Sequence, residues 1–110
     1  MLEISRITVK YPQDNRAVIN LNELEYILGE IWANIWHSND IVRINPVTGF
    51  VRSRLNLTDV VNSDREYRKS LGIQANSESV LNGIAFDSIT KRIWVTGKQW
   101  ARIYEIVPEK

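Results

Sequence analysis

The sequence predicts an all-β fold that forms part of a β-propeller. Two observations carry this prediction: the chain contains an internal repeat, and the repeated units have the pattern of short strands joined by turns. Repeats of this length and content are typical of arrays of four-stranded sheets. The first copy contains Leu21, Asn22, Tyr26, Ile31, Trp32, Ile41, Ile44 and Pro46, and the second contains Leu81, Asn82, Phe86, Ile93, Trp94, Ile103, Ile106 and Pro108.

The composition limits the size and chemistry of the protein. A chain of 110 residues with 44% hydrophobic residues can bury a modest core but is short for a complete propeller, so we expect part of a ring. A net charge of +1, spread along the chain, predicts neither a nucleic-acid partner nor an anionic membrane. The chain has no cysteine and one histidine, His37, so we expect no metal and no cofactor.

The N-terminal segment reads as the edge of a sheet. Residues 2–9 form a β-rich run in which Ile4, Arg6 and Thr8 alternate with Ser5, Ile7 and Val9, and Pro12, which cannot donate to a central ladder, follows them. We therefore expect residues 1–11 to close a blade whose other strands lie upstream. No apolar signal segment follows Met1, and the sequence predicts no location.

Residues 21–55 read as one complete four-stranded blade. Leu28-Gly29 separates strands at 21–27 and 30–36, as in a tight hairpin. The next two strands, at 40–45 and 50–55, flank a turn that begins with Pro46 and ends with Gly49.

The remainder reads as a long loop and three strands of a second blade. Residues 56–79 are polar, and Thr58 can cap a short helical turn. A loop of this length is either a lid or rim segment or a solvated connector. The strands at 80–86, 92–96 and 101–107 complete a predicted total of eight strands in two adjacent sheets.

Strand register places a candidate site at one rim. Asn22 lies six residues before the first hairpin turn and Trp36 seven after it, so antiparallel pairing brings both to one end of the sheet. The same count pairs Asn82 with Lys98. Trp36 and Lys98 occupy matched positions of the repeat, and a structural repeat does not require this divergence.

Each of these residues also has a structural interpretation. Trp32 and Trp94 occupy matching mid-strand positions that suit packing between blades. Asn22 and Asn82 could bond neighbouring backbone, Lys98 could be a solvated surface group, and His37 reads as an exposed residue after a strand. Trp36 and Trp100 lie beyond the central residues of their strands, so packing between blades constrains their side chains less.

The residues resemble the C-terminal part of the glutamine cyclotransferase family, the plant and bacterial type of glutaminyl-peptide cyclotransferase. The resemblance covers nearly the whole chain in the correct order, and its most specific segments begin at Leu21, Gly29, Ile41, Val80 and Thr96. These segments read LNELEY, GEIWANIW, IVRI, VLNGIA and TGKQW.

The resemblance implies a five-bladed propeller that converts an N-terminal glutamine to pyroglutamate without a metal and releases ammonia. It implies catalytic roles for Lys98 and Asn22 and a pocket wall at Trp36; we add Asn82 and Trp100 as expected substrate-binding residues. The expected partner is a peptide with an N-terminal glutamine, and the family suggests a secreted or periplasmic location. The family's essential glutamate lies in an earlier blade, so we expect this chain alone to be incomplete as a catalyst.

Two alternatives concern the missing carboxylate and the role of the chain. Glu23 and Glu25 are expected to point away from Asn22, because side chains alternate along a strand, and neither is expected to replace the glutamate. The competing function is a non-catalytic propeller segment that acts as an interaction or structural module. Its open blade faces predict self-association.

Overall fold

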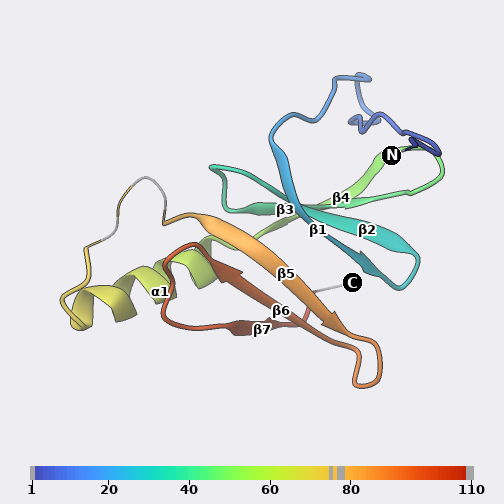
Figure 1. The fold of residues 1–110 in the computed structure, drawn as a ribbon. Helices are drawn as coiled ribbons and strands as arrows, with labels where there is room; N and C mark the ends of the chain where they lie inside the picture. The colour runs from blue at the N-terminus through green and yellow to red at the C-terminus, as the bar shows by residue number, and fades with distance from the viewer. Residues whose placement is uncertain (1, 75, 77–78, 109–110) are drawn as a thin grey trace.

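The computed structural model describes residues 2–74, 76 and 79–108 and contains two antiparallel sheets and one helix (Figure 1). The first sheet has the strand order β1-β2-β3-β4 and the second the order β5-β6-β7. This architecture confirms the sheet-rich, propeller-like fold class. The elements are β1 (Leu21–Ile27), β2 (Glu30–Ile35), β3 (Asp40–Ile44), β4 (Val51–Asn56), α1 (Thr58–Ser70), β5 (Leu81–Asp87), β6 (Arg92–Gly97) and β7 (Tyr104–Ile106).

The internal repeat corresponds to matching registers in the two sheets. Leu21 pairs with Ile35 in the first hairpin, and Leu81 pairs with Gly97 in the second. Both first strands carry a β-bulge in the three residues that follow this pair. The second copy is two residues longer at its hairpin turn, which contains residues 88–91 in the second sheet and residues 28–29 in the first.

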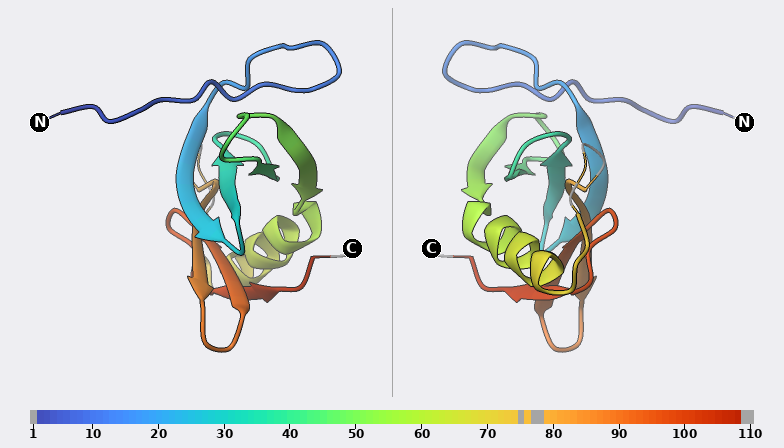
Figure 2. Two further views of the ribbon diagram at one scale, coloured as in Figure 1. Left: turned by 90° about the vertical axis from the view of Figure 1, so that its right-hand side faces the viewer. Right: turned by 90° about the vertical axis from the view of Figure 1, so that its left-hand side faces the viewer.

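The two sheets touch along their first strands and diverge outward. β1 lies beside β5, and α1 fills the wedge between β4 and β7 (Figure 2). The core between the sheets includes Trp32, which is only 3% exposed, as the sequence predicts for a packing tryptophan. Its counterpart Trp94 is half-buried, because its side of the second sheet has no described sheet against it.

The segment at 56–79, expected as a long loop with at most a short helical turn, contains the 13-residue helix α1. Leu57, Val60 and Val61 pack toward the core at helical spacing. The next two positions on this face are Asp64 and Arg68, which are charged but buried. Because these two charged residues occupy core positions, the helix lacks the continuous apolar stripe by which an amphipathic helix is recognised in a sequence.

Asp64 and Arg68 are buried as an ion pair that joins α1 to the second sheet. Arg68 Nε donates to Asp64 Oδ2 at 2.7 Å, and the hydroxyl of Tyr104 on β7 donates to Asp64 Oδ1 at 3.0 Å. Burial, and then the hydrogen bond to Asp64, raise the pKa of Tyr104. The neutral phenol therefore remains the donor that ties helix to strand.

The expected strand at residues 2–9 is absent, so the described chain has seven strands instead of eight. Lys10 alone forms isolated bridges, to Ala17 and to Phe50. Residues 2–8 lie exposed without a neighbouring strand, and an extended segment forms a ladder only when another backbone pairs with it. The third strand of the second sheet is also shorter than the expected 101–107. In the described part of the chain, no helix is long and apolar enough to cross a membrane.

We predict that Asp64→Ala lowers the free energy of unfolding by about 3 to 5 kcal/mol, because the change leaves the buried Arg68 guanidinium without its carboxylate. The matched control is Glu105→Ala, which removes the exposed ion pair with Arg92 at 3.6 Å and should cost less than about 1 kcal/mol. Urea unfolding followed by circular dichroism measures both. Equal losses in the two variants would contradict a structural role for the buried pair.

Candidate functional site

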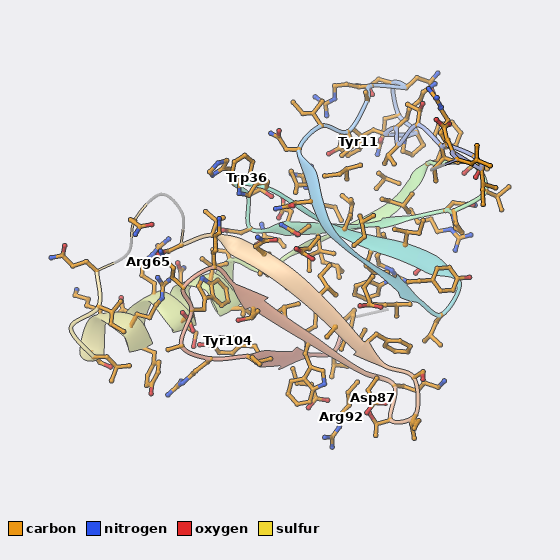
Figure 3. All side chains as sticks on the ribbon, viewed as in Figure 1. Tyr11, Trp36, Arg65, Asp87, Arg92 and Tyr104 are labelled. Atoms are coloured by element: carbon orange, nitrogen blue, oxygen red, sulfur yellow. The ribbon has the colours of Figure 1, made fainter. Side chains whose placement is uncertain are left out.

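Two equivalent turns bring the predicted site residues to one end of the sheets. We call this end the rim; it comprises the beginnings of β1 and β5 and the turns after β2 and β6. The backbone N–H of Trp36 donates to the carbonyl of Asn20 at 2.8 Å, and that of Lys98 donates to the carbonyl of Val80 at 3.0 Å. The predicted placement of Trp36 and Lys98 is therefore confirmed. Figure 3 shows Trp36 at this end and Asp87 and Arg92, from the second hairpin, at the other.

The two asparagines of the repeat meet at the rim. Asn22 Nδ2 donates to Asn82 Oδ1 at 3.2 Å, across the contact between β1 and β5. Both residues lie within the β-bulges, which interrupt the regular alternation of side chains. A carboxamide has two donor hydrogens and an oxygen that accepts more than one bond, so the pair can also bind amide groups of a ligand.

Trp36 forms a wall beside Asn22. Asn20, Leu21, Asn22 and Trp36 line a hollow of about 290 Å³. The indole of Trp36 is 38% exposed, and its ring lies 4.0 Å from that of His37, centroid to centroid. An exposed indole beside a carboxamide offers an apolar surface and a polar anchor, which together can hold a short peptide side chain.

Lys98 is an exposed residue in the turn after β6, and Trp100 covers the backbone before it. The Trp100 ring packs so closely on Gly97 that a Cβ at that position would overlap it. Trp100 Nε1 donates to the Ser79 carbonyl at 3.3 Å, and the ring meets Tyr104 edge to face. These contacts explain Trp100 as a packing residue, and its binding of substrate stays a prediction.

The structure adds Asn34, which the sequence reasoning did not select. Asn34 on β2 is completely buried, and its Nδ2 donates to the Leu81 carbonyl at 3.0 Å. This bond ties β2 to the residue before Asn82. Because the carbonyl requires a donor, it also defines which end of the side-chain amide is nitrogen. The sequence signal that could have identified Asn34 is its position as a polar residue among the apolar residues of a buried strand.

The strand-parity argument for the glutamates is wrong for Glu25. Glu25 pairs directly with Trp32, and directly paired side chains lie on the same face of a sheet. Trp32 faces the second sheet, as does Asn22. The bulge after Leu21 shifts the alternation by one residue, which the sequence pattern did not show.

A further hollow, of about 640 Å³, lies toward the opposite end of the sheets. Glu30, Arg43 and Arg52 line it. Burial alone would raise the pKa of Glu30, but hydrogen bonds from both arginines outweigh this effect and lower it. Glu30 is therefore a stably ionised ion-pair partner. No group of three histidine, cysteine, aspartate or glutamate side chains among the described residues could hold a metal ion.

Comparisons with known proteins agree on one family. The family model described as glutamine cyclotransferase matches residues 2–107. A curated glutaminyl-peptide cyclotransferase of Arabidopsis thaliana is 42% identical over 93 residues, which are 84% of this chain and 27% of the relative. The crystal structure of Myxococcus xanthus glutaminyl cyclase matches with a TM-score of 0.78 and 38% identity, over 90% of this chain and 39% of that chain. The chain thus spans less than half the length of these relatives.

We predict that Asn34→Ala lowers the free energy of unfolding by about 1 to 3 kcal/mol, because it leaves the Leu81 carbonyl without its buried donor. Asn62→Ala is the matched control: Asn62 is exposed on α1 and accepts a bond only from its helix neighbour Arg65 among the described contacts. Guanidinium unfolding compares the two. A loss no larger than that of the control would show that Asn34 does not hold the sheets together.

Proposed function

The chain belongs to the glutamine cyclotransferase family, and from this premise we propose that it supplies part of the active site of a glutaminyl-peptide cyclotransferase. The substrate class is a peptide with an N-terminal glutamine. The observation that carries the proposal is the rim: Asn22 bonds Asn82 beside the exposed Trp36, and Lys98 occupies the turn equivalent to that of Trp36.

The reaction closes a five-membered lactam. The α-amine of the substrate attacks the carbon of its own γ-amide, a tetrahedral intermediate forms, and the bond from carbon to the amide nitrogen breaks with release of ammonia. The attacking amine must be neutral, and its reference pKa of about 7.7 to 8.0 keeps much of it protonated at neutral pH. A carboxylate that accepts this proton and delivers it to the departing nitrogen meets the need.

In this proposal Lys98 and Asn22 stabilise charge and Trp36 restricts the conformation of the substrate. The amide oxygen gains negative charge as the intermediate forms, and a cation or an amide N–H placed beforehand stabilises that charge. Lys98 and Asn22 have these chemical properties. The glutamine side chain is flexible, so the indole wall of Trp36 favours the folded conformer in which the amine reaches the amide.

We expect the carboxylate that transfers the proton to come from a part of the full-length protein outside residues 1–110. Glu25, although it faces the second sheet, lies three residues along β1 from Asn22, toward the opposite end. Glu23 is exposed within the bulge. We therefore propose that a full-length protein carrying this chain performs the reaction and that the chain by itself does not.

Self-association is the second proposal, because one face of the second sheet is open. Trp94 is half-buried and Ile103 is 67% exposed, whereas the equivalent Trp32 and Ile41 are buried. Large apolar side chains that are buried in one copy of a repeat and exposed in the other favour contact with a further sheet. As an isolated unit, the chain would then act as an interaction module, with copies of itself among its partners.

For the catalytic proposal, we predict that Lys98→Ala in a full-length protein carrying this chain lowers kcat by roughly 100- to 1000-fold, as expected for the loss of one preorganised charge-stabilising group. Lys91→Ala is the matched control, because Lys91 precedes β6 at the end opposite Lys98. Ammonia release from a glutaminyl dipeptide measures both. Wild-type turnover in Lys98→Ala would remove this lysine from the site, and turnover by the isolated chain would show that its own residues suffice.

For the second proposal, we predict that the isolated chain sediments as a concentration-dependent oligomer and that Trp94→Ser shifts it toward monomer. Tyr26→Ser provides the control, because Tyr26 is 62% exposed on the other sheet. Analytical ultracentrifugation over a range of dilutions distinguishes the variants. A monomer that unfolds cooperatively and does not respond to dilution would contradict the proposal.

A further inference from the structure

The two rim turns share an unusual backbone conformation. His37 and Gln99, each one residue after a predicted site residue, have φ values of 65°. This left-handed region is uncommon for residues other than glycine and costs free energy unless the surroundings stabilise it. Strain of this kind is often retained where a neighbouring group must be held in place.

The contacts of the two side chains differ. His37 lies against the ring of Trp36. Gln99 instead reaches back across the chain, and the Ser79 hydroxyl donates to its Oε1 at 2.9 Å. Ser79 is 9% exposed whereas Gln99 is exposed, so the bond is partly buried.

Ser79 holds the Lys98 turn at two points. Its hydroxyl contacts Gln99, which follows Lys98, and its carbonyl accepts the indole N–H of Trp100. The Lys98 N–H donates to Val80, the residue after Ser79. The Trp100 ring covers Gly97 on the other side of the lysine. The backbone of Lys98 and the side chains of Gln99 and Trp100 are thus hydrogen-bonded to residues 79–80, which lead into β5 and Asn82.

We infer that Gln99 is a positioning residue for Lys98: its bond to Ser79 holds the strained turn in one conformation and thereby sets the position of Lys98 at the rim. The inference rests on the proposed function, in which Lys98 stabilises charge during cyclisation. Gln99 itself need not touch the substrate. It acts through Lys98, because a charged group contributes fully only when its position is set before the reaction.

The test is a double-mutant cycle in a full-length protein carrying this chain. Gln99→Met keeps the length of the side chain and removes its hydrogen-bonding groups. We expect kcat for a glutaminyl dipeptide to fall roughly 10- to 100-fold, since small displacements of a reacting group have effects of this size, while KM stays unchanged. In the Lys98→Ala background, the same change should alter kcat by less than about 2-fold, because the group that it positions is gone.

Two controls separate positioning from folding. Gln13→Met makes the same chemical change in an exposed turn near the N-terminus and should leave kcat unchanged. On the partner side, Ser79→Ala should reproduce the loss of kcat and Ser79→Thr, which keeps the hydroxyl, should restore it. If Gln99→Met folds poorly, the comparison of Ser79→Ala with Ser79→Thr still tests the inference.

The outcomes separate the two hypotheses. If Lys98→Ala lowers kcat but Gln99→Met does not, the role of Gln99 alone is overturned. The same holds if Gln99→Met lowers kcat by an equal factor with and without Lys98. Wild-type turnover in Lys98→Ala would overturn the assignment of Lys98 and this inference with it. Loss of kcat in Gln99→Met that disappears without Lys98 supports the inference.

Discussion

The contact between the first strands of the two sheets determines where every other part of the protein can lie. β1 and β5 touch, and the completely buried Asn34 fastens β2 to the beginning of β5. Beyond this contact the sheets diverge, and the space between them is filled by core side chains that include Trp32 and by the helix α1. The buried Asp64 and Arg68 pair is tolerated in that wedge because each charge has its partner and Tyr104 supplies a further bond.

The same contact generates the candidate site. Two copies of one hairpin, placed side by side with their bulges in register, bring Asn22 against Asn82 and set two turns of equal geometry beside them. At the rim, the two turns present different groups: an indole in one and an amine in the other. A repeat therefore provides the scaffold, and in the proposed function the difference between the two turns provides the chemistry.

Much of this arrangement could be predicted from the sequence, for a physical reason. Hairpin register follows from the positions of turns, so the shared end of Asn22, Trp36, Asn82 and Lys98 was predictable by counting residues. The resemblance carried by the same motifs predicted the family. What escaped prediction depended on contacts between distant residues. The helix was missed because Asp64 and Arg68 occupy its buried face, and Glu25 was misplaced because a bulge leaves no mark in the alternation of side chains. Residues 2–9 have a strand-like pattern, but no described strand lies against them.

We propose that the rim binds an N-terminal glutamine. The most direct test is an NMR titration of the isotope-labelled chain with a glutaminyl dipeptide and, separately, with the matching pyroglutamyl dipeptide. We predict that the glutaminyl peptide shifts the side-chain amide signals of Asn22 and Asn82 and the indole signal of Trp36. The pyroglutamyl peptide, which lacks the free α-amine and the primary γ-carboxamide, should shift them less. Shifts confined to the opposite end, around Glu30 and the hairpin turns, or an equal response to both peptides, would contradict the claim.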